Sequence, residues 1–172
     1  MRAARQILCF SSLAVALLLA GKTTVVSAAE TLSPIKPEGD TELTYQAPSG
    51  TIVRVKISQT RLDPSSFPYK GGLLWGGDVD QLPQTVLSSI QITQSRKTVF
   101  IALSAYSDLG DVKFASLEPT KEGFALHLHG GNTAASYDAT LSFRRGYLRT
   151  RIVRLREFPE ERWEKTSYSF PR

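Results

Sequence analysis

Cysteine is nearly absent from this chain, and its absence excludes several kinds of chemistry. The only cysteine among the 172 residues is Cys9, in an apolar stretch near the N-terminus. If this stretch is removed as a leader, the rest of the chain can form no disulfide, bind no zinc through thiolates and use no cysteine nucleophile. Histidine is almost as rare, with two residues in the whole chain. Imidazole chemistry is thus confined to His127 and His129.

The usual catalytic motifs are missing too. The sequence contains no G-x-S-x-G turn, no Walker phosphate loop, no H-E-x-x-H pair and no calcium-loop pattern. Neighbouring acids occur at Asp78/Asp80 and at Asp108/Asp111, both in turn-like stretches where aspartate is common. We therefore expect no cofactor, and these absences favour a protein without catalytic activity over an enzyme.

Helical periodicity is weak, and alternation of apolar and polar residues dominates instead. Only two short stretches, 104–110 and 82–89, have any helical or turn character. In "TIVRVKIS", Val53, Val55 and Ile57 share one face, and polar side chains occupy the other. Comparable stretches recur along the chain and are separated by short turns. The predicted strands cover 41–46, 51–58, 86–93, 98–103, 112–118, 124–129, 136–143, 147–155 and 162–170.

This pattern predicts an all-β fold, a single antiparallel sandwich or barrel of eight to nine strands in meander order. The domain should span 42–172 and follow a flexible leader over 30–41, which is rich in proline and charge. One long connection, 61–84, does not fit a simple meander. Its aromatic residues Phe67, Tyr69 and Trp75 form either a secondary binding loop or a plug over one end of the strands.

The first 29 residues predict a secretory signal peptide. Arg2 and Arg5 precede an apolar run from Ile7 to Gly21 that is too short to span a bilayer comfortably. Small residues then suit cleavage, so that the mature chain should begin at Ala29 or Glu30. We expect an exported protein, periplasmic or secreted, with no membrane span in the mature chain. A core helix or an uncleaved anchor is the alternative.

Removal of the signal peptide also lowers the charge. Arg2, Arg5 and Lys22 leave with it, so that the 21 basic residues fall to 18 against 16 acidic residues, and the net charge falls from +5 to +2. A balance this close to neutral does not favour a nucleic-acid partner.

Six arginines nevertheless gather in one predicted hairpin. They are Arg144, Arg145, Arg149, Arg151, Arg154 and Arg156. A bulge at Ile152–Val153 would place the last four on one face and make a surface for anions or nucleic acid. The glutamates that follow, of which Glu164 is one, can instead form ion pairs with the arginines across strands. We expect this second arrangement, a structural one.

His127 and His129 lie two residues apart in a predicted strand and therefore share one face. This geometry suits two imidazoles on one metal ion, but a site needs a further ligand, which only carboxylates such as Asp138 or Glu122 could supply. Two solvent-facing histidines on the polar side of a half-buried strand are the simpler interpretation. We therefore expect no metal.

The stretch "GGNTAASY", residues 130–137, separates two well-patterned strands. Its glycines let a strand end, and its small side chains would let a partner approach closely. The candidate binding loop consists of Gly130, Gly131, Asn132, Ser136 and Tyr137. Tyrosine is a frequent anchor at interfaces, although the spacing of Tyr137 also suits the core face.

This loop, the leader and the all-β pattern together resemble the bacterial periplasmic inhibitors of invertebrate-type lysozyme. The similarity covers about Val86 to Phe170. It implies an antiparallel β-sandwich that inserts a loop with a serine and a tyrosine, here Ser136 and Tyr137, into the lysozyme cleft.

Three functions follow as hypotheses. The first is an exported, non-enzymatic binding domain, of which an inhibitor of a lysozyme-like muralytic hydrolase is the most specific version. The second is a metal- or carboxylate-dependent enzyme that uses His127 and His129. The third is a structural envelope component or an oligomerisation module.

Overall fold

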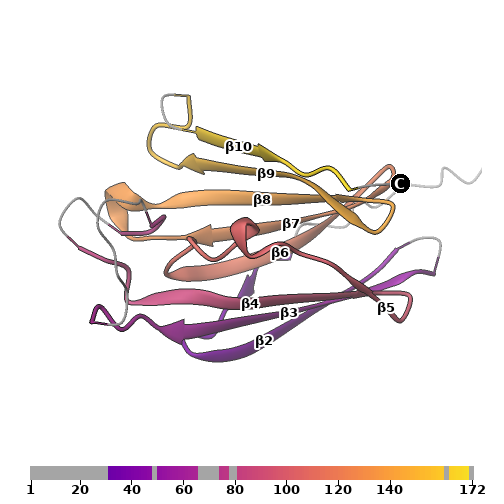
Figure 1. The fold of residues 1–172 in the computed structure, drawn as a ribbon, viewed down its shortest axis with the longest axis horizontal. Coiled ribbons are helices and arrows are strands. Elements are labelled where there is room, and N and C mark those ends of the chain that lie inside the picture. Colours follow the sequence, from indigo (N-terminus) through magenta and orange to yellow (C-terminus); the bar gives the residue numbers. More distant parts are fainter. Residues whose placement is uncertain (1–30, 48–49, 66–73, 78–80, 161–162, 171–172) are drawn as a thin grey trace, which may run out of the picture.

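The computed structural model of the chain describes residues 31–47, 50–65, 74–77, 81–160 and 163–170. These residues form two antiparallel sheets that pack against each other (Figure 1). The six-stranded sheet has the order β1-β6-β7-β8-β9-β10 and the four-stranded sheet the order β2-β3-β4-β5. The all-β prediction is confirmed, and of the two architectures left open the chain adopts the sandwich.

The strands follow the predicted stretches closely. Their bounds are β1 Ser33–Pro34, β2 Gly39–Gln46, β3 Ile52–Arg61, β4 Thr85–Gln94, β5 Lys97–Val99, β6 Val112–Thr120, β7 Gly123–Gly130, β8 Tyr137–Arg144, β9 Tyr147–Leu155 and β10 Trp163–Ser167. Two short 3-10 turns complete the description, η1 Leu103–Ala105 and η2 Thr133–Ala135. None of the helical segments in the described part of the chain is long and apolar enough to cross a membrane.

Each sheet is largely a meander, since β2 to β5 and β6 to β10 pair in chain order. β1 departs from this order because it pairs with β6, with Ser33 opposite Ala115. The prediction of a loose leader over 30–41 therefore does not describe residues 33–35, nor residues 39–41, which open β2. Ile35 is buried in the core, and Pro34, which has no N–H to donate, is tolerated in a strand at the edge of a sheet.

Three local predictions are also corrected. The stretch 82–89, a weak helix candidate, enters β4 at Thr85 instead. The strand predicted over 98–103 ends at Val99, and η1 follows it. The irregular pairing in the arginine hairpin lies between Ser142 and Phe143 rather than at Ile152–Val153.

The core lies between the sheets and consists of the apolar members of the alternating patterns. On β3, Val53, Val55 and Ile57 are buried. On the facing sheet, Phe124 of β7 stacks on Phe143 of β8 with ring centres 4.7 Å apart. Because successive side chains point to opposite faces, this packing fixes which residues of each strand face solvent.

A buried glutamine links the two sheets. The side-chain nitrogen of Gln59 donates to the carbonyl oxygens of Lys36 and Val112, at 2.9 and 2.8 Å. Its side-chain oxygen accepts from the amide of Val112 at 3.0 Å and from the hydroxyl of Thr85 at 3.3 Å. The whole hydrogen-bonding capacity of this amide is used, as burial of a polar group requires. Gln59 thereby ties β3 to the first residue of β6.

Candidate functional site

The outer face of the six-stranded sheet carries a groove of about 480 Å³ with a mixed polar and apolar lining, which we call the histidine groove. It is contributed by β7, β8, β9 and the turn that follows β9. The lining residues are His127, His129, Asp138, Thr140, Ile152, Arg154, Leu155, Arg156 and Pro159. The prediction that His127 and His129 share one face is confirmed, since both are partly exposed between buried neighbours on β7.

The register of the strands arranges these side chains in two rows across the sheet. His129 lies opposite Asp138, which lies opposite Arg154. His127 lies opposite Thr140, which lies opposite Ile152 on β9. Directly opposed residues bring their side chains within contact distance, so that each row behaves as a unit.

Asp138 is the centre of the first row. Its carboxylate accepts hydrogen bonds from Arg156 at 2.7 Å and contacts Nδ1 of His129 at 2.6 Å. Partial burial works to raise the pKa of Asp138, but the hydrogen bonds from Arg156 and His129 outweigh it and leave the pKa below its ordinary value. The carboxylate is therefore ionised at neutral pH and holds both neighbours in place.

In the second row, Nδ1 of His127 lies 3.2 Å from the hydroxyl of Thr140, and its Nε2 lies 2.9 Å from a carboxylate oxygen of Glu118. A hydroxyl, an imidazole and a carboxylate in this order resemble a hydrolytic triad, but here Nδ1 faces the hydroxyl and Nε2 the carboxylate, the reverse of the usual arrangement. Such a site also needs donors that stabilise an oxyanion. Thr140 lies in the middle of β8, paired on both sides, so that the backbone around it is engaged in the sheet.

The two histidines do not converge on one point. His127 contacts Glu118 and His129 contacts Asp138, so each imidazole has a carboxylate of its own. Glu122, the other suggested ligand, instead forms an ion pair with Arg144. Within the described ranges, no group of three or more histidine, cysteine, aspartate or glutamate side chains is placed to hold a metal ion.

The candidate binding loop divides into a buried base and an exposed tip. Gly130 and Gly131 are buried, and a Cβ on Gly130 would lie 2.5 Å from the hydroxyl of Tyr137. The exposed residues are 132–134, with Asn132 held by a hydrogen bond from Lys113. Ser136 is partly exposed, and its carbonyl accepts from the amide of Arg156 at 2.8 Å. The end of the loop at Ser136 therefore borders the histidine groove.

Tyr137 belongs to the core, and the suggestion that it anchors a partner is wrong. It is 0% exposed, and its hydroxyl donates to the carbonyl of Gly110 at 2.9 Å. Burial raises its pKa well above the ordinary value. The alternation along β8 already pointed to this position, because Ala139, Leu141 and Phe143 share its face.

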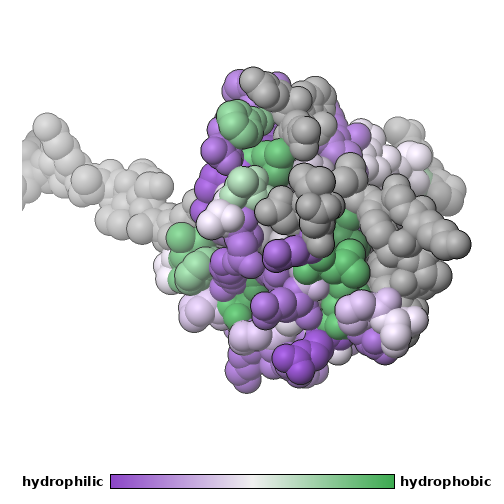
Figure 2. Space-filling model, turned by 90° about the vertical axis from the view of Figure 1, so that its left-hand side faces the viewer, coloured by the Kyte–Doolittle hydropathy of each residue, from purple (hydrophilic) through white to green (hydrophobic). Residues whose placement is uncertain are grey.

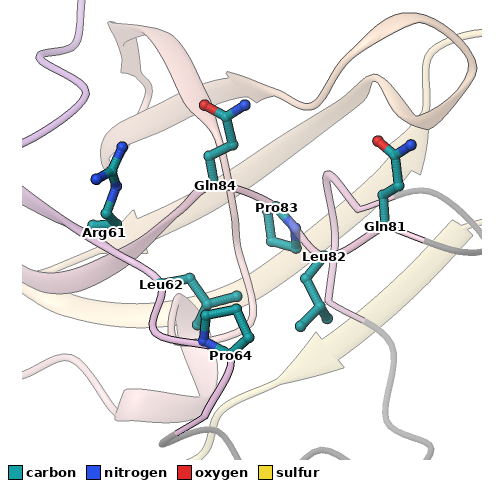
Figure 3. Close-up of a pocket in the computed structure, with 7 residues that line it drawn as sticks. All are labelled: Arg61, Leu62, Pro64, Gln81, Leu82, Pro83 and Gln84. Carbon is teal, nitrogen blue, oxygen red and sulfur yellow. The ribbon is translucent and has the colours of Figure 1, made fainter.

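Of the secondary binding loop, Phe67 and Tyr69 lie outside the described residues, and Trp75 packs inward. Its ring centre lies 6.0 Å from that of Tyr137, and its indole N–H donates to Glu164 at 3.4 Å. Trp75 thus behaves as part of a plug. Beside this connection lies a shallow pocket of about 590 Å³ between residues 61–64 and 81–84 (Figure 3). Among the described residues that line it, Arg61 alone is charged.

The arginines do not form one face. Arg151 points into the molecule, where it is 2% exposed and forms ion pairs with Asp108, at 2.7 Å, and with Glu164. The predicted cross-strand pairing of arginine with Glu164 is confirmed, but Asp108 was not foreseen as a partner. Arg156 instead turns outward to Asp138. The expected structural role therefore holds for Arg151, at a buried position rather than an exposed one.

Comparison of the chain with known protein families, with characterised proteins and with solved structures gives no match. Fold and site therefore define the class: an antiparallel β-sandwich with a histidine-lined groove on the outer face of its larger sheet.

Proposed function

We propose that this chain is an exported binding domain and that it recognises a protein partner through the histidine groove and the adjoining loop tip, residues 132–134. The observation that carries the proposal is the fixed cluster of Asp138, His129 and Arg156 at the base of the loop that bears this tip. Side chains held by strands and by each other lose little freedom on binding, which favours recognition. The groove lies toward the end of the sandwich shown in Figure 2, where a hydrophilic surface is interrupted by separate hydrophobic patches.

The groove combines cationic and apolar groups. Arg154 and Arg156 offer guanidinium donors, and Ile152, Leu155 and Pro159 offer apolar contact. Guanidinium groups bind carboxylates with defined geometry, and arginine is common among the residues that dominate binding energy. A partner with an acidic side chain next to an apolar one fits this lining.

A lysozyme-like hydrolase of the invertebrate type is the partner that we propose, on the strength of the sequence resemblance. The contacts would differ from those implied by that resemblance, because Tyr137 is buried. Ser136 and the tip residues would approach the partner instead. The test is inhibition of an invertebrate-type lysozyme by the purified protein, together with the variants Asn132→Glu and Arg154→Glu, which change the tip and the groove separately.

Both variants should weaken inhibition at least tenfold without changing the urea midpoint. Arg96→Glu, which makes the same charge change as Arg154→Glu but in the distant β4–β5 turn, should leave inhibition unchanged. Equal loss in all three variants would show a general charge effect and contradict the proposed surface. A protein that inhibits no lysozyme but associates with itself would favour the structural or oligomerisation hypothesis.

A second candidate function, a hydrolase, is favoured by one observation, the Thr140–His127–Glu118 chain of contacts. Turnover of a chromogenic ester series would test it. Activity that Thr140→Val and Glu118→Gln abolish, while Arg154→Glu retains it, would make the enzyme the better description. Without such activity the binding domain stands alone.

A further inference from the structure

Three hairpin turns, β4–β5, β6–β7 and β8–β9, lie together at the end of the sandwich opposite the loop tip, on the right in Figure 1. The amide of Ser95 donates to the carbonyl of Ile52 at 3.1 Å, which joins the β4–β5 turn to the start of β3. The amide of Arg145 donates to the carbonyl of Glu122 at 3.1 Å and joins the β6–β7 and β8–β9 turns. A Cβ on Gly146 would lie 3.8 Å from the side chain of Gln94, so the turns of the two sheets are neighbours. We call this region the turn end.

An exposed aromatic cluster lies at the turn end. Phe100, just after β5, meets Phe170 edge to face with ring centres 6.2 Å apart. Tyr147, the first residue of β9, lies 5.3 Å from the same ring. Phe100 is 66% exposed and Tyr147 48% exposed. Large rings that gather on a surface, rather than lying scattered, are a mark of an interaction site.

Basic residues are frequent in the turns at this end of the sandwich. Residues 94–97, 120–123 and 144–149 contain one acid, Glu122, which pairs with Arg144. Their basic residues are Arg96, Lys97, Lys121, Arg144, Arg145 and Arg149. The guanidinium of Arg149 lies over the ring of Tyr147, 5.4 Å from its centre, so that charge and aromatic surface are in direct contact.

We propose that the turn end is a docking surface for the face of an anionic phospholipid membrane. Transfer of a phenylalanine ring from water to the boundary between headgroups and acyl chains is favourable in free energy, and tyrosine is enriched in the same layer. Lysine and arginine beside them meet the negative surface potential of anionic lipids. A planar layer of headgroups can contact all the turns at once, whereas a rod-like polyanion crossing this end would contact only some of them. Charge alone does not account for the exposed rings of Phe100 and Tyr147.

Docking in this way would orient the molecule. The loop tip and the end of the histidine groove lie at the other end of the strands and would face away from the membrane (Figure 1). The proposal does not depend on the identity of the partner at the groove, and it can fail or succeed independently of it.

The experiment is co-sedimentation of the protein, purified from cells that express the full chain, with large unilamellar vesicles. One set contains phosphatidylcholine alone and the other contains a quarter phosphatidylglycerol. We expect binding to the anionic vesicles and little to the neutral ones. Arg96→Glu/Lys97→Glu should weaken binding at least about 20-fold, since each basic residue near such a surface contributes about fivefold before reversal is counted.

Phe100→Ser/Tyr147→Ser should weaken binding to anionic vesicles at least tenfold, because the rings provide the apolar part of the contact. Lys36→Glu/Arg61→Glu, the same charge change away from the turn end, is the matched control and should bind as the wild type does. Urea midpoints confirm that the variants fold; a second aromatic variant, Phe100→Ser alone, should lose part of the binding if the pair is unstable.

Four results would overturn the proposal. Equal binding to neutral vesicles, or unchanged binding of both turn-end variants, would place the contact elsewhere in the chain, for example in the N-terminal apolar stretch. If the charge variant loses vesicle binding but the aromatic variant does not, and the protein binds heparin or single-stranded DNA equally tightly, the turn end is a general polyanion surface. Absence of binding to either vesicle would exclude membrane docking.

Discussion

Replacement of Arg151 by methionine tests whether the buried ion cluster stabilises the sandwich. Methionine keeps most of the length and volume of the side chain but removes the charge and the hydrogen bonds to Asp108 and Glu164. Both carboxylates would remain beside an apolar group. Removal of one partner from a buried ion pair costs about 3–5 kcal/mol, because the other charge is left uncompensated.

The free-energy cost should be smaller here, because the two carboxylates are only partly buried. Asp108 and Glu164 keep 31% and 41% of their side-chain exposure, so that water can solvate them in part once Arg151 is gone. We therefore expect Arg151→Met to lower the free energy of unfolding by about 2–3 kcal/mol at pH 7. With a urea m-value of about 2 kcal/mol/M, the midpoint should fall by about 1–1.5 M.

The matched control is Arg144→Met, which breaks the exposed pair with Glu122 and should leave the midpoint nearly unchanged. Asp108→Asn added to Arg151→Met should restore part of the loss, because it removes an uncompensated charge. A midpoint for Arg151→Met no lower than that of Arg144→Met would refute the reasoning.

A pH series sharpens this test. Burial raises the pKa of Asp108, and the charge and hydrogen bonds of Arg151 offset this only in part. A carboxyl whose pKa is raised by folding favours the folded state at low pH, and this contribution is lost as the pH rises through the folded pKa. Without Arg151 the pKa should rise further, so Arg151→Met should regain stability relative to wild type between pH 7 and pH 5.

Other expectations follow from the same structure. Tyr137→Phe should cost about 1–2 kcal/mol of unfolding free energy in urea titrations, because its backbone acceptor stays buried; an unchanged midpoint would show that the hydrogen bond is unimportant. Because folding lowers the pKa of Asp138, its carboxylate stabilises the fold above its ordinary pKa of 3.8, and this stabilisation is lost in stronger acid. The difference in urea midpoint between wild type and Asp138→Asn should therefore shrink on acidification. A difference that stays constant would contradict this expectation. Calorimetric titration with zinc should give no sub-micromolar site; one that His127→Ala removes would reverse this expectation and favour an enzyme. Intact-mass analysis of exported protein should give an N-terminus at residue 29 or 30, and retention of residues 1–28 would refute cleavage.

Local alternation made most of the sheet predictable. Whether a side chain on β7 points inward depends only on its parity, so the shared face of His127 and His129 could be derived without knowledge of the neighbouring strands. The same parity placed Tyr137 beside Ala139 in the core, where the structure has it. The suggestion that Tyr137 anchors a partner at the surface conflicted with this alternation, and the alternation predicted the position of Tyr137 correctly.

Contacts between distant segments could not be derived in this way. Asp108 lies in an irregular turn after η1, and no periodicity relates it to Arg151. The pairing of Ser33 with Ala115 likewise depends on how the two sheets pack, not on the sequence near either residue. The clustering of Phe100 with Phe170 has the same origin, since β5 and β10 end different sheets.

The pairing of β1 with β6 has a consequence for the order in which the chain can fold. β1, the first strand to be synthesised, cannot pair until β6 has been made, and β6 follows the entire four-stranded sheet in the chain. Gln59 waits in the same way for Val112, the residue that opens β6. Until β6 is available, the smaller sheet can pair its strands but has nothing to cover its apolar face. Such dependence on distant contacts slows folding. During synthesis from the N-terminus, the chain would therefore remain without its complete core until β6 has been made. Translocation through a narrow channel requires a polypeptide that has not yet folded.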